Sequence, residues 1–136
     1  YDALWDDAKK WYAYTNQSIR HTIPDKQRGV VIYINVKYVD IDGMDDNLND
    51  KQLLAQHLYN TEWTHQWLDY VTRTTGRLTK SVRVVDVKNV GREKVNYRFG
   101  KRYGLVTDQM EDYYPQLLEF GYIVNPIFWM KVLWDT

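Results

Sequence analysis

The pattern of hydrophobic and polar positions predicts one long helix in the middle of the chain, from Asn49 to about Thr75. Asn49 and Gln52 have the spacing of a helix N-cap and its reciprocal partner, and Gly76 suits a left-handed C-cap. Apolar positions recur at three- and four-residue steps, as a helix requires. The stripe is wide enough to pack on more than one side, since it comprises Leu53, Leu54, Leu58, Thr61, Trp63, His65, Trp67, Leu68, Tyr70 and Val71.

Two elements are predicted before this helix. An amphipathic helix begins near Leu4 and ends before Pro24, because the position preceding a proline disfavours helical backbone. Residues 30–39 then alternate in polarity as a strand does. Both faces of this strand are partly apolar, so we expect it to be central in its sheet or covered by another element.

After the long helix the pattern predicts an antiparallel hairpin. Residues 81–89 are rich in Val, with a break in alternation at Val84 and Val85 that suggests a bulge, and residues 95–99 form the returning strand. Residues 100–104 then make a basic loop tip, and Asn125 with Pro126 opens a closing helix. The expected fold is α+β: a small antiparallel sheet packed against a long central helix, with an N-terminal helix and a short C-terminal helix.

Length and composition favour a single folded domain over residues 1–136, with 44% hydrophobic and 15% aromatic residues. Six Trp and twelve Tyr exceed what a core of this size readily hides, which favours an interaction protein. Cysteine is absent, and no apolar run approaches the roughly 18 residues that span a bilayer. No signal-peptide segment opens the chain, so we expect a soluble protein made inside the cell.

Charge is distributed unevenly although the net charge is zero. Residues 29–50 and 105–136 carry an excess of acids, whereas residues 76–104 carry an excess of bases. Such a distribution suits self-complementary association or an anionic partner. It also suits charges that neutralise one another within one molecule, and the sequence leaves these alternatives open.

Candidate metal and catalytic groups are incomplete. The acidic residues 40–47 have partly the spacing of a calcium loop, but Lys51 stands where the closing bidentate Glu belongs, so we interpret them as a solvated loop. Glu62 and His65 form a Glu-x-x-His pair with His57 two turns earlier, without the second pair of a carboxylate-bridged metal site. No nucleophile motif or phosphate-binding loop is present, so we expect no cofactor and no enzyme, with a hydrolase built from scattered carboxylates as the remaining alternative.

Three segments within residues 75–130 resemble, in the same order, motifs of the neck or tail-completion proteins that join head to tail in long-tailed bacteriophages. The first follows the long helix, the second is an acidic aromatic segment and the third opens the closing helix. The residues that carry the resemblance are Thr75, Gly76, Arg77, Leu78, Ser81, Tyr114, Glu119, Phe120, Gly121, Pro126 and Phe128. Physically, Gly76 would turn the helix into a strand, Leu78 would anchor that turn in the core, and Glu119 would pair with Arg77 or Arg83.

The resemblance implies a structural virion protein in the neck, made in the host cytoplasm. It would assemble with itself as a hexameric or dodecameric ring, contact the head connector and the tail tube or terminator proteins, and surround passing DNA, with no membrane partner. The interface candidates are Trp63, Trp67, Arg98, Lys101, Arg102, Tyr103, Tyr113 and Trp129. A tail-terminator ring is one alternative, and a nucleic-acid-binding module that uses the bases and aromatics of residues 98–103 is another.

Overall fold

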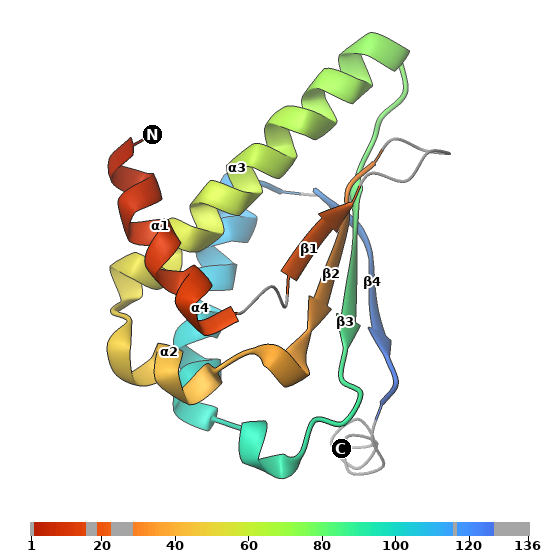
Figure 1. Ribbon diagram of the computed structural model, residues 1–136. Coiled ribbons are helices and arrows are strands. Elements are labelled where there is room, and N and C mark those ends of the chain that lie inside the picture. The colour runs from red at the N-terminus through yellow and green to blue at the C-terminus, as the bar shows by residue number, and fades with distance from the viewer. Residues whose placement is uncertain (1, 16–18, 23–28, 116, 127–136) are drawn as a thin grey trace.

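Helices lie to one side of a small sheet in the computed structural model, which describes residues 2–15, 19–22, 29–115 and 117–126 (Figure 1). The order of elements confirms the α+β class. The elements are α1 (Asp2–Thr15), β1 (Ile19–Thr22), β2 (Val31–Asn35), the 3-10 turn η1 (Val36–Tyr38), α2 (Ile41–Asn47), α3 (Asp50–Thr75), β3 (Ser81–Asp86), the 3-10 turn η2 (Arg92–Lys94), α4 (Tyr97–Tyr113) and β4 (Leu118–Val124).

The sheet is mixed, so its expected antiparallel pairing is wrong. Its strand order is β1-β2-β3-β4; β1 runs antiparallel to β2, whereas β2, β3 and β4 are parallel neighbours. Parallel strands need long crossover connections, usually helical. Here α2 and α3 lie between β2 and β3, and α4 lies between β3 and β4. These two crossovers place α3 and α4 beside the sheet.

The long helix α3 confirms the prediction at both ends. The Asn49 side chain accepts a hydrogen bond from the Gln52 backbone N–H (2.9 Å), and the Gln52 side chain accepts one from the Asn49 N–H (3.0 Å). At the other end Gly76 has φ = 67°, a left-handed conformation that favours glycine. The helix ends where the chain must turn back toward β3.

The predicted hairpin is wrong, because the segment of the expected returning strand starts a helix. The Asn96 side chain accepts a hydrogen bond from the Phe99 backbone N–H (2.9 Å) and caps α4. Phe99, Val106 and Met110 are buried at helical spacing, and this spacing outweighs the short alternation of residues 95–99. Residues 100–104 are therefore helical and form no loop tip.

Other boundaries differ from the expectations. The first helix ends at Thr15, and β2 ends at Asn35 before a 3-10 turn. The expected acidic loop is the helix α2, because the Asp40 side chain accepts a hydrogen bond from the Gly43 N–H (3.0 Å) at its start. The irregularity of β3 lies between Ser81 and Val82, where β4 carries an extra residue, and not at Val84 and Val85. The predicted closing helix falls in residues 127–136, outside the described part.

The core lies where the helices meet at the end of the molecule that contains α2. Leu53 of α3, 1% exposed, is among its most deeply buried side chains. Around it pack Trp11, Val39, Met44, Leu48, Phe99 and Val106. Leu78 does not anchor the turn after α3, as had been expected, because its side chain is 73% exposed.

The difference in burial predicts a large loss of stability for one leucine truncation and almost none for the other. Leu53→Ala removes a fully buried side chain and leaves a cavity, so it should lower the free energy of unfolding by about 2–5 kcal/mol. Leu78→Ala should change it by less than about 0.5 kcal/mol, because the side chain is exposed. Urea denaturation of both variants measures the difference. A large loss of stability in Leu78→Ala would contradict the exposed position of that residue.

Candidate functional site

A cavity lies between the inner face of the sheet and the helices α3 and α4. Its smaller part has a volume of about 90 Å³, and a wider cleft of about 420 Å³ adjoins it toward the end of α4. The two share His57, Thr61, Arg83, Leu117 and Leu118 in their walls. Further apolar surface comes from the sheet side, through Ile19, Ile32 and Ile34. The site therefore combines an apolar patch with many polar side chains, and small-molecule sites likewise join apolar surface to polar groups that fix orientation.

The strands present alternate residues to the cavity. Ile32 and Ile34 of β2 line it, as do Ser81 and Arg83 of β3. Ile32 pairs with Arg83 in register, and on the other side Arg83 pairs with Gly121 of β4. Since Gly121 has no side chain, the space beside Arg83 on that side is not filled by its cross-strand neighbour.

Helix α3 contributes an unusual polar row to the same cavity. Gln56, Asn60 and Thr64 follow one another at four-residue steps and therefore lie on one face of the helix. Gln56 and Thr64 are each 3% exposed. Sequence reasoning missed this row because it followed only the apolar stripe. Polar side chains at helical spacing beside that stripe were the signal that could have found it.

Several polar atoms in the cavity walls lack a hydrogen-bond partner among the described residues. They are Gln56 Oε1, His57 Nε2 and Arg83 Nε, all buried. Buried polar atoms in native proteins are nearly always paired, with protein, water or ligand. The three atoms are therefore open to hydrogen bonds from water or from a bound molecule.

The charge inside the cavity is concentrated on Arg83. Burial, with a smaller contribution from the Arg83 charge, lowers the pKa of His57 to about 4, so that this imidazole is neutral at pH 7. Burial likewise raises the pKa of Tyr103 to about 12 and keeps its hydroxyl neutral. Burial also lowers the pKa of His21. Among the described lining residues, Arg83 is the one cation, and Glu111 at the exposed side of the cleft is the one carboxylate.

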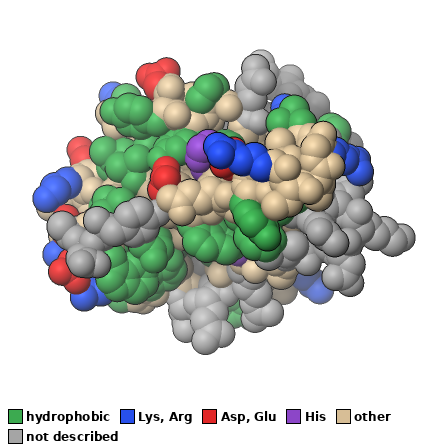
Figure 2. All heavy atoms as spheres, turned by 90° about the horizontal axis from the view of Figure 1, so that it is seen from above, with side chains coloured by type: hydrophobic (Ala, Val, Ile, Leu, Met, Phe, Trp, Pro, Cys, Tyr) green, Lys and Arg blue, Asp and Glu red, His purple; other side chains and the backbone are tan. Residues whose placement is uncertain are grey.

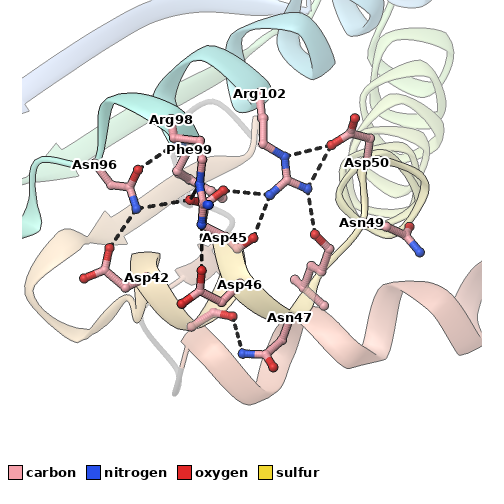
Figure 3. A network of polar contacts seen from close by, with 12 residues as sticks. Asp42, Asp45, Asp46, Asn47, Asn49, Asp50, Asn96, Arg98, Phe99 and Arg102 are labelled. Atoms are coloured by element: carbon pink, nitrogen blue, oxygen red, sulfur yellow. Dashed lines mark hydrogen bonds and ion pairs between the residues drawn. The ribbon is translucent and has the colours of Figure 1, made fainter.

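A second polar cluster joins α2 to α4 and lies away from the cavity (Figure 3). The Asp45 side chain is fully buried and pairs with Arg98 and, at 2.7 Å, with Arg102. Arg98 also pairs with Asp46 (2.6 Å), and Arg102 with Asp50 (2.8 Å). Burial alone would raise the pKa of Asp45, but the hydrogen bonds from Arg102 and Arg98 hold it below its ordinary value. These acidic and basic segments therefore neutralise each other within one molecule.

This cluster and the helix α4 also exclude the expected nucleic-acid surface. Arg98 and Arg102 are bound to aspartates, and Phe99 is buried. Tyr103 packs against Phe99 and His57, with ring centres 5.5 and 4.8 Å apart. Lys101 alone among the candidates of this segment is exposed without a described ion pair. Apart from Lys101, these side chains are thus bound to aspartates or packed within the protein.

The aromatic interface candidates are spread over the molecule. Trp63 is 42% and Tyr113 65% exposed, whereas Trp67 is partly buried. Trp129 lies outside the described residues. Figure 2 shows hydrophobic side chains gathered in several groups on the face seen from above. A role of these residues in an interface stays a prediction.

The described residues of the three sequence motifs lie at the ends of helices, in a turn and in a strand. Thr75 ends α3 and Gly76 caps it; Arg77 and Leu78 are exposed in the turn that follows. The Ser81 hydroxyl donates to the Leu117 carbonyl (2.9 Å) and ties β3 to the start of β4. Glu119, Phe120 and Gly121 belong to β4, and Pro126 follows that strand. Phe128 and the Glu119 side chain are not described, so pairing of Glu119 with Arg77 or Arg83 stays a prediction.

The Glu-x-x-His pair holds two helices together. Glu62 accepts hydrogen bonds from the Tyr114 hydroxyl and from Gln66 (2.8 Å), and the first of these lowers its pKa most. The His65 ring packs against Tyr114, with centres 5.5 Å apart. These contacts fix the end of α4 to α3 beside the cleft. No group of three potential metal ligands occurs in the described residues.

Comparison with protein families decides what kind of domain contains this cavity. The model of the CRAL/TRIO domain matches residues 15–136. The chain belongs to the CRAL/TRIO family. A search of curated proteins found no match.

Membership of the CRAL/TRIO family, a family of lipid-binding domains, overturns the resemblance to phage neck proteins. The neck-ring and tail-terminator functions, the ring partners and the virion location are therefore wrong. The motif residues that the structure describes lie in ordinary structural positions, at the helix cap after α3, at the end of α4 and along or just after β4.

The polar cluster predicts a pH-dependent contribution of Asp45 to stability. Because the folded-state pKa of Asp45 lies below its ordinary value of 3.8, its contribution is present above that value and is lost as pH falls through the folded-state pKa. Asp45→Asn should therefore lower the Tm by roughly 5 °C or more at pH 7. The difference from the unmodified protein should shrink below about pH 4.

The matched control is Asp46→Asn, since the Asp46 side chain is 67% exposed and pairs only with Arg98 at the surface. It should change the Tm little. Calorimetry from pH 3 to pH 7 gives both differences. An Asp45→Asn difference that stays constant down to pH 3 would show that the ionised carboxylate contributes nothing.

Proposed function

We propose that this CRAL/TRIO domain, acting as one unit over residues 1–136, binds a lipophilic ligand in the cavity between its sheet and α3 and α4 and carries it in that cavity. The observation on which this rests is the combination of an apolar lining with unpaired buried polar atoms in one place. Apolar walls favour the transfer of a hydrocarbon chain out of water. The polar atoms offer partners to a head group.

The position of the cavity supports this proposal. Its floor is the sheet, whose strands are fixed by backbone pairing, and its opposite wall is the pair of helices α3 and α4. The side chains of Glu62, Tyr114 and His65 hold these helices together at the wider end. A cavity with such walls exists before the ligand arrives, which reduces the ordering cost of binding.

A carrier site has to bind and release its ligand without changing it chemically, whereas a catalytic site has to convert it. CRAL/TRIO domains are ligand-binding carriers rather than enzymes. We propose that this chain likewise releases its ligand chemically unchanged, with His57 and Tyr103 acting as neutral packing and hydrogen-bonding groups. In the described residues no helix has both the length and the apolar character to cross a bilayer.

A substitution that fills the cavity tests the proposal. Thr61 lies in the walls of both the smaller part of the cavity and the wider cleft, so Thr61→Phe should occupy the space of the ligand. We expect at least a tenfold loss of affinity, about 1.4 kcal/mol, for a fluorescent fatty-acyl probe. Transfer of the probe between vesicles should fall in parallel.

Thr74→Phe is the matched control, because Thr74 is exposed on α3 and its hydroxyl bonds only to its own helix backbone. It should bind and transfer the probe as the unmodified protein does. Circular dichroism confirms that both variants fold. Equal binding by both variants would place the ligand elsewhere, and an unmodified protein that neither binds the probe nor co-purifies with lipid would refute the proposed function.

A further inference from the structure

Arg83 sits in the wall of an apolar cavity without a described ion pair. It lies on β3, which is paired on both sides and therefore holds it firmly in the sheet. Its Nε is buried and makes no hydrogen bond to a described residue. The Arg83 side chain is only partly buried, but a partly desolvated charge without a partner is still less favourable than one that is paired or fully exposed.

The two arginines of the α2–α4 cluster are paired with carboxylates and so differ from Arg83. Arg98 and Arg102 each contact two aspartates, and Arg102 also donates to the backbone carbonyl of Leu48 (2.6 Å). The neighbours of Arg83 offer nothing comparable. Across the sheet it faces Ile32 on one side and Gly121 on the other.

The groups above Arg83 are neutral at physiological pH. Burial, and to a smaller extent the Arg83 charge, lowers the pKa of His57, so the imidazole is unprotonated. Burial raises the pKa of Tyr103 more than the Arg83 charge lowers it, so the phenol is protonated. His57 Nε2 and Gln56 Oε1 are also unpaired beside it. Around Arg83 the cavity therefore offers one positive charge and neutral polar groups, and the carboxylate of Glu111 lies at the exposed side of the adjoining cleft.

On this basis, and building on the proposed function, we propose that the cavity selects a lipophilic ligand with a monoanionic head group, a carboxylate or a phosphodiester, which Arg83 binds. A guanidinium matches two oxygens of such a group in a bidentate pair. One negative charge neutralises Arg83, the one cation among the described lining residues, whereas a second would be left unpaired. The hydrocarbon part then lies against Ile32, Leu117 and Leu118.

Three ligands with the same chain and different head groups test this directly. Oleate, oleyl alcohol and oleylamine are titrated into the purified protein at pH 7.4 below their aggregation concentrations, and calorimetry gives each affinity. We expect oleate to bind at least tenfold more tightly than oleyl alcohol, and oleylamine to bind most weakly. Lysophosphatidylglycerol, a single-chain phosphodiester, forms a fourth arm that shows which monoanion is preferred.

Variants then assign the preference to Arg83. Arg83→Gln should lose the preference for oleate over oleyl alcohol but keep its affinity for the alcohol, and Arg83→Lys should keep part of the preference because the charge remains. The control is Arg77→Gln, which removes an exposed arginine from the turn after α3 and should behave as the unmodified protein. Unchanged oleate preference in Arg83→Gln would overturn the assignment.

The outcomes separate this inference from the function on which it rests. If the unmodified protein binds oleate and oleyl alcohol equally, the selection of anions is refuted while lipid binding stands. If it binds none of the four ligands, both proposals fail. This comparison uses the unmodified protein alone, so it decides the question even where Arg83→Gln does not fold.

Discussion

The parallel pairing of β3 with both of its neighbours is the constraint on which the rest of this structure depends. Parallel strands cannot be joined by a tight turn, so each connection has to leave the sheet and return to its starting end. The chain does so with α3 before β3 and with α4 after it. Both helices lie on the same side of the sheet (Figure 1), and side chains of these helices and of the strands line the cavity. The site is thus a direct result of the topology.

Elements whose signals are local could be predicted from the sequence. The ends of α3 depend on side chains a few residues apart, Asn49 with Gln52 at one end and Gly76 at the other. Strand pairing depends on contacts between residues far apart in the chain. Nothing in the alternation of residues 81–89 distinguishes a strand that pairs with its sequential neighbour from one that pairs in parallel with β2 and β4. The predicted hairpin failed for this reason, and with it the expected position of the basic residues.

The motifs that resembled phage neck proteins illustrate how little a short motif specifies. A glycine that ends a helix before a strand solves a backbone problem common to many folds, and Gly76 does so here with a left-handed conformation. Tyr114 closes α4 and binds Glu62, which secures one helix to another. Such roles recur in unrelated families because they follow from helix and strand geometry. Gln56 and His57 lie on α3 and Arg83 lies on β3, so no contiguous motif could have identified the three cavity-lining residues together.

The sequence did not show which charges pair within the molecule. The structure separates bases that pair with acids from Arg83, which lies in the cavity wall. Most of the basic excess in α4 meets the acids of α2 and the start of α3, where Asp45 is buried between Arg98 and Arg102 (Figure 3). That part of the charge stabilises the fold and is unavailable to a partner. Arg83 is different, since it lies in an apolar cavity among neutral groups. Desolvating such a cation lowers stability, and a bound anion would restore the lost interaction. Arg98 and Arg102 each bind two aspartates, whereas Arg83 has no carboxylate partner among the described residues, so it differs from them in being open to a ligand in the cavity.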